Sequence, residues 1–238
     1  MKNTILHKAN TRGHANHGWL NAYHSFSFAS WYNPERVQFG VLRVLNDDTV
    51  AAGMGFGTHP HDNMEIITIP LEGDLAHKDS MGNAETIKTG DIQVMSAGTG
   101  IQHSEFNPNA DHHTKLFQIW LFPKVRNVAP RYQQITLDTS DRHNKLQQIL
   151  SPNADDAGVW IYQDAWFHMG NLDKGTTIDY NRKKVGNGLY VFVIKGSVKV
   201  DGQELEQRDG LGITDFDKVS FEATSDTEVL LMEVPMEQ

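Results

Sequence analysis

The sequence predicts an all-β protein made of two tandem antiparallel β-barrels. Three observations support this prediction. Apolar and polar residues alternate with a period of two along much of the 238-residue chain, which is the pattern of strands with one buried face. Turn residues recur at intervals of about 8–12 residues, a spacing typical of sandwiches and barrels. The two halves of the chain also repeat one order of strands and turns.

The repeat relates residues 67–95 to residues 191–213. Each segment is predicted to form a strand, a glycine turn, a second strand, a glycine-containing turn and two further strands. The corners with matching glycines are Gly73 with Gly196 and Gly82 with Gly202. Glycine suits such corners because tight turns often require a positive φ. A duplicated barrel explains this pattern better than one large sandwich does.

The boundary between the halves follows from a break in the strand pattern. Residues 137–158 mix scattered apolar residues with many polar ones, and Pro152 interrupts them. We expect a short helix and a linker there. Before the break, residues 115–122 form a nearly continuous apolar strand, which indicates a position covered on both faces. The predicted domains are 1–132 and 133–238.

Two pairs of potential metal ligands lie in the first half. His59 and His61 are two residues apart, as are His103 and Glu105. Side chains two residues apart on a strand point to the same face. Pro60 suits an edge strand, because proline cannot donate to a sheet ladder. If the two strands are neighbours, three imidazoles and one carboxylate converge inside the barrel.

Such a donor set predicts one divalent transition metal per chain. The sequence contains no cysteine, which excludes disulfides, thiolate sites and cysteine nucleophiles. Nitrogen and oxygen ligands suit Fe(II), Mn, Co, Ni, Cu or Zn about equally. Four protein ligands leave coordination positions open for a substrate or O2. No histidine follows His168, so a second site of this kind is not expected in the C-terminal barrel.

These residues also resemble the two motifs of the cupin superfamily. The first motif is matched by Gly53, His59, His61, Glu65 and Gly73, with one extra residue before Gly73. The second is matched by Gly90, Gly98, His103 and Asn107, with Ser96 in place of proline and two extra residues before His103. The surrounding segments, from Arg12 to Pro130, are similar to the pirin family and especially to its bacterial branch. The C-terminal half follows that family only in outline.

The resemblance implies a bicupin, in which both barrels are jelly rolls and the second has no metal ligands. It implies that Glu105 is the fourth ligand, which leaves Glu65 beside the metal site or at its rim. Cupins with this ligand set include flavonol-cleaving dioxygenases, and bacterial pirins resemble quercetin 2,3-dioxygenase. The expected reaction joins an aromatic flavonol-like substrate with O2 and releases carbon monoxide and a depside. Fe(II) is then the first choice of metal, and Glu105 is the catalytic base.

A second function of a different class is also consistent with the resemblance. Eukaryotic pirins look like iron-dependent partners of transcription regulators. This chain would then be a metal- or redox-sensing binding protein with a regulatory protein partner. A pocket too small for a bicyclic substrate, together with a contiguous apolar surface patch, would favour that alternative.

Composition limits the remaining partners. Lys and Arg number 21 against 30 Asp and Glu, a formal net charge of -9. Direct binding to nucleic acid is therefore not expected. No apolar segment has the length of a signal peptide or a membrane span, which predicts a soluble cytoplasmic protein. The sequence leaves the oligomeric state open, and a monomer is the simplest expectation.

Two further groups of residues invite a role near the metal. An N-terminal segment is expected to pack on the barrel as a strand, with a lid over the metal as the alternative; it contains His14, His17, Trp19 and His24. Gln118 and Trp120 share one face of their strand. An inward-facing Gln118 would need a polar partner inside the barrel. An outward-facing one would not, and the sequence leaves this choice open.

Overall fold

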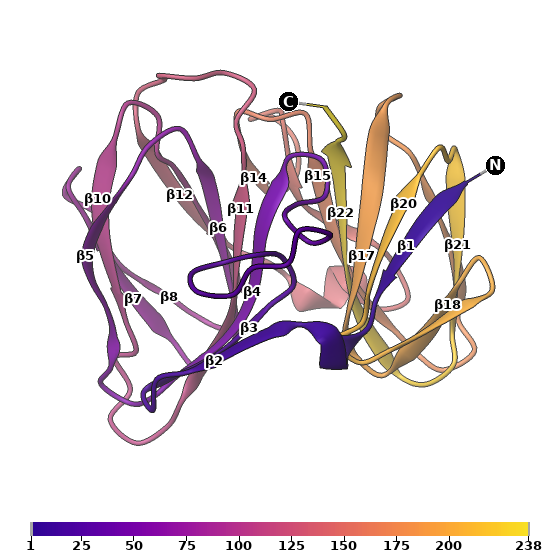
Figure 1. Ribbon diagram of the computed structural model, residues 1–238, viewed down its shortest axis with the longest axis horizontal. Coiled ribbons are helices and arrows are strands. Elements are labelled where there is room, and N and C mark those ends of the chain that lie inside the picture. The colour runs from indigo at the N-terminus through magenta and orange to yellow at the C-terminus, as the bar shows by residue number, and fades with distance from the viewer. Residues whose placement is uncertain (1, 238) are drawn as a thin grey trace.

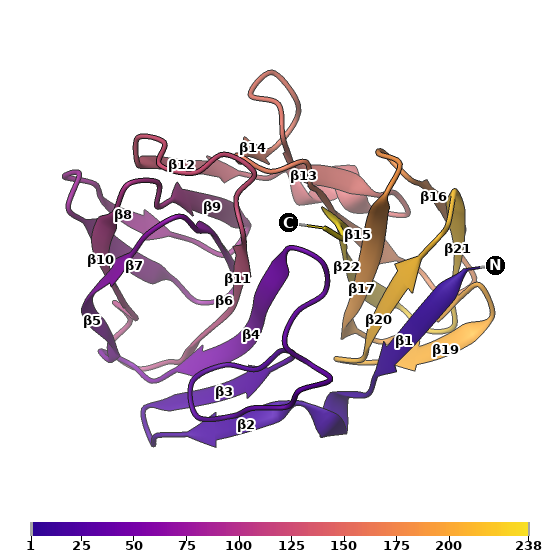
Figure 2. The same cartoon turned by 45° about the horizontal axis from the view of Figure 1, so that its top comes forward.

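The computed structural model describes residues 2–237, which form two β-barrels side by side (Figures 1 and 2). Each barrel has one seven-stranded and one four-stranded sheet. The helices within residues 2–237 are two short 3-10 segments, η1 (Ala9–Thr11) and η2 (Thr139–Arg142). The predicted all-β bicupin architecture is therefore confirmed.

The N-terminal barrel surrounds the predicted metal ligands. Its seven-stranded sheet has the order β12-β9-β6-β11-β4-β3-β2, and its four-stranded sheet has the order β5-β10-β7-β8. The strands are β2 (Gly13–Asn16), β3 (Leu20–His24), β4 (Leu42–Val50), β5 (Gly55–His61), β6 (Glu65–Glu72), β7 (Leu75–Asp79), β8 (Ala84–Ile87), β9 (Asp91–Ser96), β10 (Ile101–Phe106), β11 (Thr114–Leu121) and β12 (Arg131–Thr136). The apolar strand predicted at residues 115–122 is β11, which lies between β6 and β4.

The C-terminal barrel repeats this plan. Its sheets have the orders β1-β20-β17-β22-β15-β13-β14 and β16-β21-β18-β19. The strands are β1 (Asn3–His7), β13 (Gln147–Ser151), β14 (Val159–Trp160), β15 (Trp166–Leu172), β16 (Thr177–Asn181), β17 (Asn187–Lys195), β18 (Ser197–Val200), β19 (Gln203–Glu206), β20 (Gly210–Thr214), β21 (Lys218–Ala223) and β22 (Thr227–Pro235). The repeated segments become β6–β9 and β17–β20. Gly73 and Gly196 occupy equivalent corners with φ of 74° and 77°.

Each barrel contains a strand, or part of one, from outside its predicted half of the sequence. β1 pairs antiparallel with β20, so the first strand of the chain lies in the C-terminal barrel. In both views its indigo ribbon runs beside β20 (Figures 1 and 2). β12 pairs with β9 and extends the N-terminal sheet to Thr136. The division at residues 132 and 133 stays a prediction, and in the structure this point lies inside β12.

The segment predicted as a short helix and linker contains more structure than expected. The 3-10 helix η2 begins after Asp138, whose carboxylate accepts a hydrogen bond from the backbone of Ser140. The following residues form β13 and, further on, β14, which pair in parallel. Ile149 and Leu150 are completely buried. Burial against the second barrel, rather than local helix propensity, therefore makes this segment extended.

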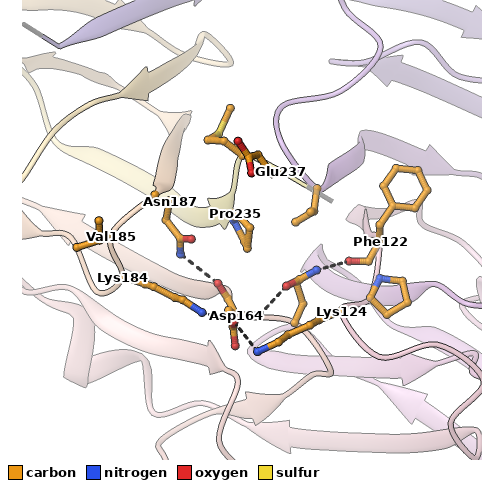
Figure 3. A pocket seen from close by; sticks show the side chains of 13 residues that line it. Phe122, Lys124, Asp164, Lys184, Val185, Asn187, Pro235 and Glu237 are labelled. Atoms are coloured by element: carbon orange, nitrogen blue, oxygen red, sulfur yellow. Dashed lines mark hydrogen bonds and ion pairs between the residues drawn. The ribbon is translucent and has the colours of Figure 1, made fainter.

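The two seven-stranded sheets face each other across the largest apolar cluster of the molecule. Phe117 of β11 meets Phe192 of β17 edge to face, with ring centroids 5.5 Å apart. Polar contacts continue this interface at one side (Figure 3). There Lys124 and Lys184 both point to Asp164 and form ion pairs with its carboxylate. The barrels are thus joined as one packed unit.

The interiors of the two barrels differ. The C-terminal barrel is filled by a single cluster of apolar side chains. The N-terminal barrel contains two smaller apolar clusters instead. Between them lie buried polar residues, including His77, His103, Glu105 and Gln118. Within residues 2–237, no helix is long and apolar enough to cross a membrane.

Candidate metal centre

Strand pairing brings the two predicted ligand pairs together. β5 and β10 are antiparallel neighbours, with His59 opposite His103 and His61 opposite Ile101. β5 is the edge strand of its sheet, as Pro60 predicted. Because each pair has the i, i+2 spacing, its members share a face of the four-stranded sheet. The three imidazoles therefore meet inside the barrel mouth.

The three imidazoles form a compact donor group. His59, His61 and His103 each offer a ring nitrogen, and these nitrogens all lie within 4.8 Å of one another. Burial, together with the neighbouring histidines, lowers the pKa of His61 to about 4 and that of His103 to about 2. Both rings are therefore neutral at pH 7, which leaves lone pairs available for a metal.

The hydrogen bonding of these rings fits a metal ion. Within residues 2–237, neither ring nitrogen of His103 has a hydrogen-bond partner, and the same holds for Nε2 of His61. Such buried orphan nitrogens are rare unless an ion or water completes them. His59 Nδ1 lies 2.8 Å from the carbonyl oxygen of Gly57. A carbonyl only accepts, so Nδ1 donates and Nε2 keeps its lone pair free for coordination.

Glu105 lies in a second, overlapping group. The register between β10 and β5 shifts between His103 and Glu105, which places Glu105 opposite Phe56. Glu105 offers an oxygen within 4.8 Å of ligand atoms of His103 and His77. His103 belongs to both groups. The ligand atoms of the four predicted residues are therefore connected through His103 and do not form a single group in which all lie within 4.8 Å of one another. The assignment of Glu105 as fourth ligand stays a prediction.

Two side chains hold the Glu105 carboxylate. Gln118 Nε2 donates to Oε1 at 3.2 Å and to Oε2 at 3.1 Å. Thr68 in turn donates to Gln118 Oε1 at 3.4 Å. Gln118 therefore faces inward, and its polar partner is the carboxylate. Burial raises the pKa of Glu105, and Gln118 is among the groups that counteract the rise.

His77 is a functional candidate that the sequence reasoning missed. It lies directly opposite Glu105 on β7, and its Nε2 is 3.3 Å from Asp79 Oδ2. Its Nδ1 is buried without a partner in the described chain. The available signal was parity, since Leu75, His77 and Asp79 alternate with more exposed residues along β7. Parity alone does not show which residue lies opposite His77 on the neighbouring strand.

Glu65 lies away from the imidazoles. Its Oε2 accepts a hydrogen bond from Ser96 at 2.6 Å. Burial raises its pKa to about 7, against the opposing effects of Ser96 and Arg131. It belongs to neither group of metal-ligating side chains found within residues 2–237. The resemblance placed Glu65 beside the site or at its rim. In the structure its carboxylate is held by the hydrogen bond from Ser96.

The N-terminal segment forms β2 and β3 and packs on the barrel beside β4. His24 is buried there, with Nδ1 2.8 Å from Asn46 Oδ1. His14 stacks on Tyr23 at the surface, with ring centroids 4.5 Å apart. His17 is exposed. The expected packing strand is therefore present, and His24 is the histidine of this segment that reaches a cavity.

That cavity has a volume of about 260 Å³ and borders the metal-ligand group. His59, Glu105 and Gln118 form part of its wall. Most of the remaining wall is apolar and consists of Leu20, Ala22, Phe28, Phe56 and Trp120. The polar part of that wall consists of His24, Asn46 and Asp48. Asp48 Oδ1 is buried and has no partner in the described chain. Burial, with Asp47 and Glu105 nearby, raises the pKa of Asp48 to about 8.

Comparison with known proteins identifies the family. The family model Pirin matches residues 6–121, and the model of the quercetinase C-terminal cupin domain matches residues 148–234. The chain belongs to the pirin family. Quercetin 2,3-dioxygenase of Escherichia coli K12 is 45% identical over 230 residues, which cover 97% of this chain and 98% of the relative. A pirin-like protein of Caulobacter vibrioides is 41% identical over 222 residues, or 93% of this chain and 95% of the relative.

Solved pirin structures share the whole architecture. The crystal structure of YhhW from Escherichia coli has a TM-score of 0.94 and 44% identity, and the match covers 99% of both chains. The bacterial pirin YhhW in complex with nickel(II) has a TM-score of 0.92 and 44% identity, over 98% of this chain and 99% of the other. A divalent metal is thus present in a close structural relative of this pirin.

Proposed function

We propose that this pirin is a metal-dependent dioxygenase that cleaves a flavonol-like aromatic substrate with O2. The observation that carries the proposal is the position of the three imidazoles of His59, His61 and His103. They lie close together, and His59 forms part of the wall of a mainly apolar cavity that also contains the buried carboxylate of Glu105. The similarity to quercetin 2,3-dioxygenase over nearly the full length supports the same reaction class.

The proposed metal ligands are His59, His61, His103 and Glu105. A divalent transition metal held there would lower the pKa of a substrate hydroxyl and stabilise the resulting anion. Fe(II) remains our first choice, and the nickel complex of YhhW makes Ni(II) a practical metal for reconstitution. His77 is the competing fourth ligand, because it also lies within 4.8 Å of His103 and Glu105.

Glu105 is the proposed base. Its carboxylate is buried, and this burial raises its pKa, so it holds a proton more readily than an exposed carboxylate does. Gln118 fixes its orientation through both oxygens. A substrate hydroxyl that enters the cavity meets Glu105 next to the imidazoles, and the proton passes to a carboxylate oxygen.

The cavity wall selects the substrate. Phe28, Phe56 and Trp120 offer aromatic surface to a flat ring system. At about 260 Å³ the cavity is close to the lower limit of typical small-molecule sites, roughly 300 Å³. It is therefore sized for a single aromatic substrate of few rings. A mainly apolar cavity beside the metal-ligand group favours catalysis over the metal-sensing alternative, for which a surface patch would be the functional element.

The test is oxygen uptake and carbon monoxide release with quercetin as the probe. Wild type loaded with Fe(II) or Ni(II), the apo protein and Glu105→Gln are compared. Glu105→Gln keeps the shape and an oxygen ligand but removes the basicity. We expect it to bind metal and to lose turnover by about 10²–10⁴-fold.

Two outcomes would contradict the proposal at different points. If the loaded wild type consumes no oxygen above the apo control, the dioxygenase function is wrong, and the metal-sensing binding protein replaces it. If Glu105→Gln turns over at the wild-type rate, Glu105 is not the base. His61→Ala and His103→Ala, analysed for bound metal, test the ligand set separately, and each is expected to lose stoichiometric metal.

A further inference from the structure

Within residues 2–237, a buried arginine at the junction of the two barrels forms no hydrogen bond or ion pair with a carboxylate. Arg142 belongs to η2 and is only 9% exposed. Its Nη1 contacts the sulfur of Met169 at 3.1 Å, and its Nε has no hydrogen-bond partner within residues 2–237. In that part of the chain it also forms no ion pair with a carboxylate. A desolvated guanidinium in this condition is destabilising unless an anion completes it.

The guanidinium lines a cavity of about 280 Å³. One side of this cavity comes from β6 and the turn before β9, and the other comes from β15 and β22. Its wall consists of Ile69, Pro70, Leu71, Thr89, Gly90, Asp91, Leu137, Thr139, Arg142, Met169, Asn171 and Glu228. Ile69 and Met169 belong to the apolar cluster between the barrels. The cavity is therefore separate from the metal site, which lies inside the N-terminal barrel.

We propose that this cavity binds a small organic monocarboxylate, whose carboxylate pairs with Arg142. The planar guanidinium offers a fork of N–H donors that matches a carboxylate. Apolar walls formed by Ile69, Leu137 and Met169 suit a short carbon skeleton better than a fully hydrated ion.

The other acidic groups on the wall limit the ligand to one negative charge. Asp91 is already occupied, because its oxygens accept hydrogen bonds from the backbone of Lys88 and from Gln134 and Thr136. Glu228 also lines the cavity, and within residues 2–237 it forms no ion pair. Its carboxylate is close enough to Arg142 to oppose the lowering of the arginine's pKa by burial. It repels any anion that enters the cavity, and it repels a dianion such as phosphate more strongly than a monocarboxylate.

Such a ligand would connect the two barrels. η2 lies in the segment between them, while Met169 and Glu228 come from the C-terminal barrel and Ile69 from the N-terminal one. A molecule that binds only the folded, joined state stabilises that state by mass action. Occupancy is therefore expected to raise the melting temperature of the whole chain.

The experiment uses the metal-loaded full chain and isothermal titration calorimetry at constant ionic strength. The probes are sodium benzoate, its neutral analogue benzamide and inorganic phosphate. We expect benzoate to bind with one site that depends on Arg142, and benzamide and phosphate to bind at least about tenfold more weakly. Arg142→Met removes the charge at similar length and should weaken benzoate binding at least about tenfold. Glu228→Gln should reduce the difference between the affinities for benzoate and for phosphate.

Carboxylates also bind open metal centres, and the variants separate the two events. Binding at the metal survives Arg142→Met, whereas binding at the proposed site does not. The proposal is overturned if benzoate binds wild type and Arg142→Met with equal affinity. It is also overturned if wild type shows no benzoate binding that depends on Arg142. Without ligand, Arg142→Met should melt at or above the wild-type temperature because the unpaired charge is gone. A lower melting temperature would assign Arg142 a structural role and would equally overturn the proposal.

Discussion

Gln118 links the barrel scaffold to the proposed base, and its replacement tests the organisation of the metal site. Gln118→Leu removes the amide that donates to both oxygens of Glu105 and keeps a side chain of similar size. The distances of 3.1 and 3.2 Å mark ordinary hydrogen bonds to a carboxylate. A hydrogen bond to a charged group contributes about 1.5–3 kcal/mol. The carboxylate would lose this stabilisation and its fixed orientation.

The expected effect on metal binding follows from that energy. Because about 1.4 kcal/mol corresponds to a tenfold change in an equilibrium constant, the affinity for Ni(II) should fall by about 10–100-fold. This agrees with the usual effect of removing a residue that orients a metal ligand. The assay is competition with a chromophoric chelator, followed by turnover at saturating metal, where the loss should persist because Glu105 is no longer held.

The matched control is Gln163→Leu. Gln163 is buried like Gln118, but its amide donates to the backbone oxygen of Phe122 at the junction of the barrels. This variant should lose stability and keep its metal affinity. An unchanged Ni(II) affinity in Gln118→Leu, or an equal loss in both variants, would refute the reasoning from hydrogen bonding to Glu105.

Two further predictions concern stability. Phe117 is completely buried against Phe192, so Phe117→Ala should lower the free energy of unfolding in urea by about 3–5 kcal/mol. The variant should keep its full metal content. A decrease in the free energy of unfolding of less than about 1 kcal/mol would contradict the packing argument. Burial lowers the pKa of His168 from 6.5 to about 3, so the unfolded chain binds the extra proton below pH 6.5 and stability falls as the pH decreases towards 3. His168→Leu should remove about 1–2 kcal/mol of the decrease between about pH 7.5 and 5, and equal slopes in both proteins would show that His168 is not responsible.

The strands and the ligand pairs were predictable because their signals are local. A period of two fixes which residues share a face, whatever the partner strand is. That sufficed to place His59 on one face with His61, and His103 on one face with Glu105. The meeting of the two pairs was expected only on the condition that their strands are neighbours, which the pairing of β5 with β10 fulfils. Positive-φ corners are equally local, and Gly73 and Gly196 marked equivalent turns of the repeat.

The direction of Gln118 was not predictable for a definite reason. β11 is covered on one side by the barrel interior and on the other by the second barrel, so most of its residues are buried. The alternation of apolar and polar residues that normally reveals the inner face is therefore lost. Only the assembled barrel shows that Gln118 points to Glu105, while Phe117 points to the other barrel.

By itself, the sequence determined the all-β class, the duplication and the histidine pairs, since each depends on spacing within one strand or turn. The tertiary structure decided which strands pair and which residues lie opposite each other. It placed β1 in the C-terminal barrel, put His77 opposite Glu105, and shifted the register after His103. Within residues 2–237, it also left Nε of Arg142 without a hydrogen-bond partner between the barrels. These features depend on barrel closure and on contacts between remote segments, which no local pattern encodes.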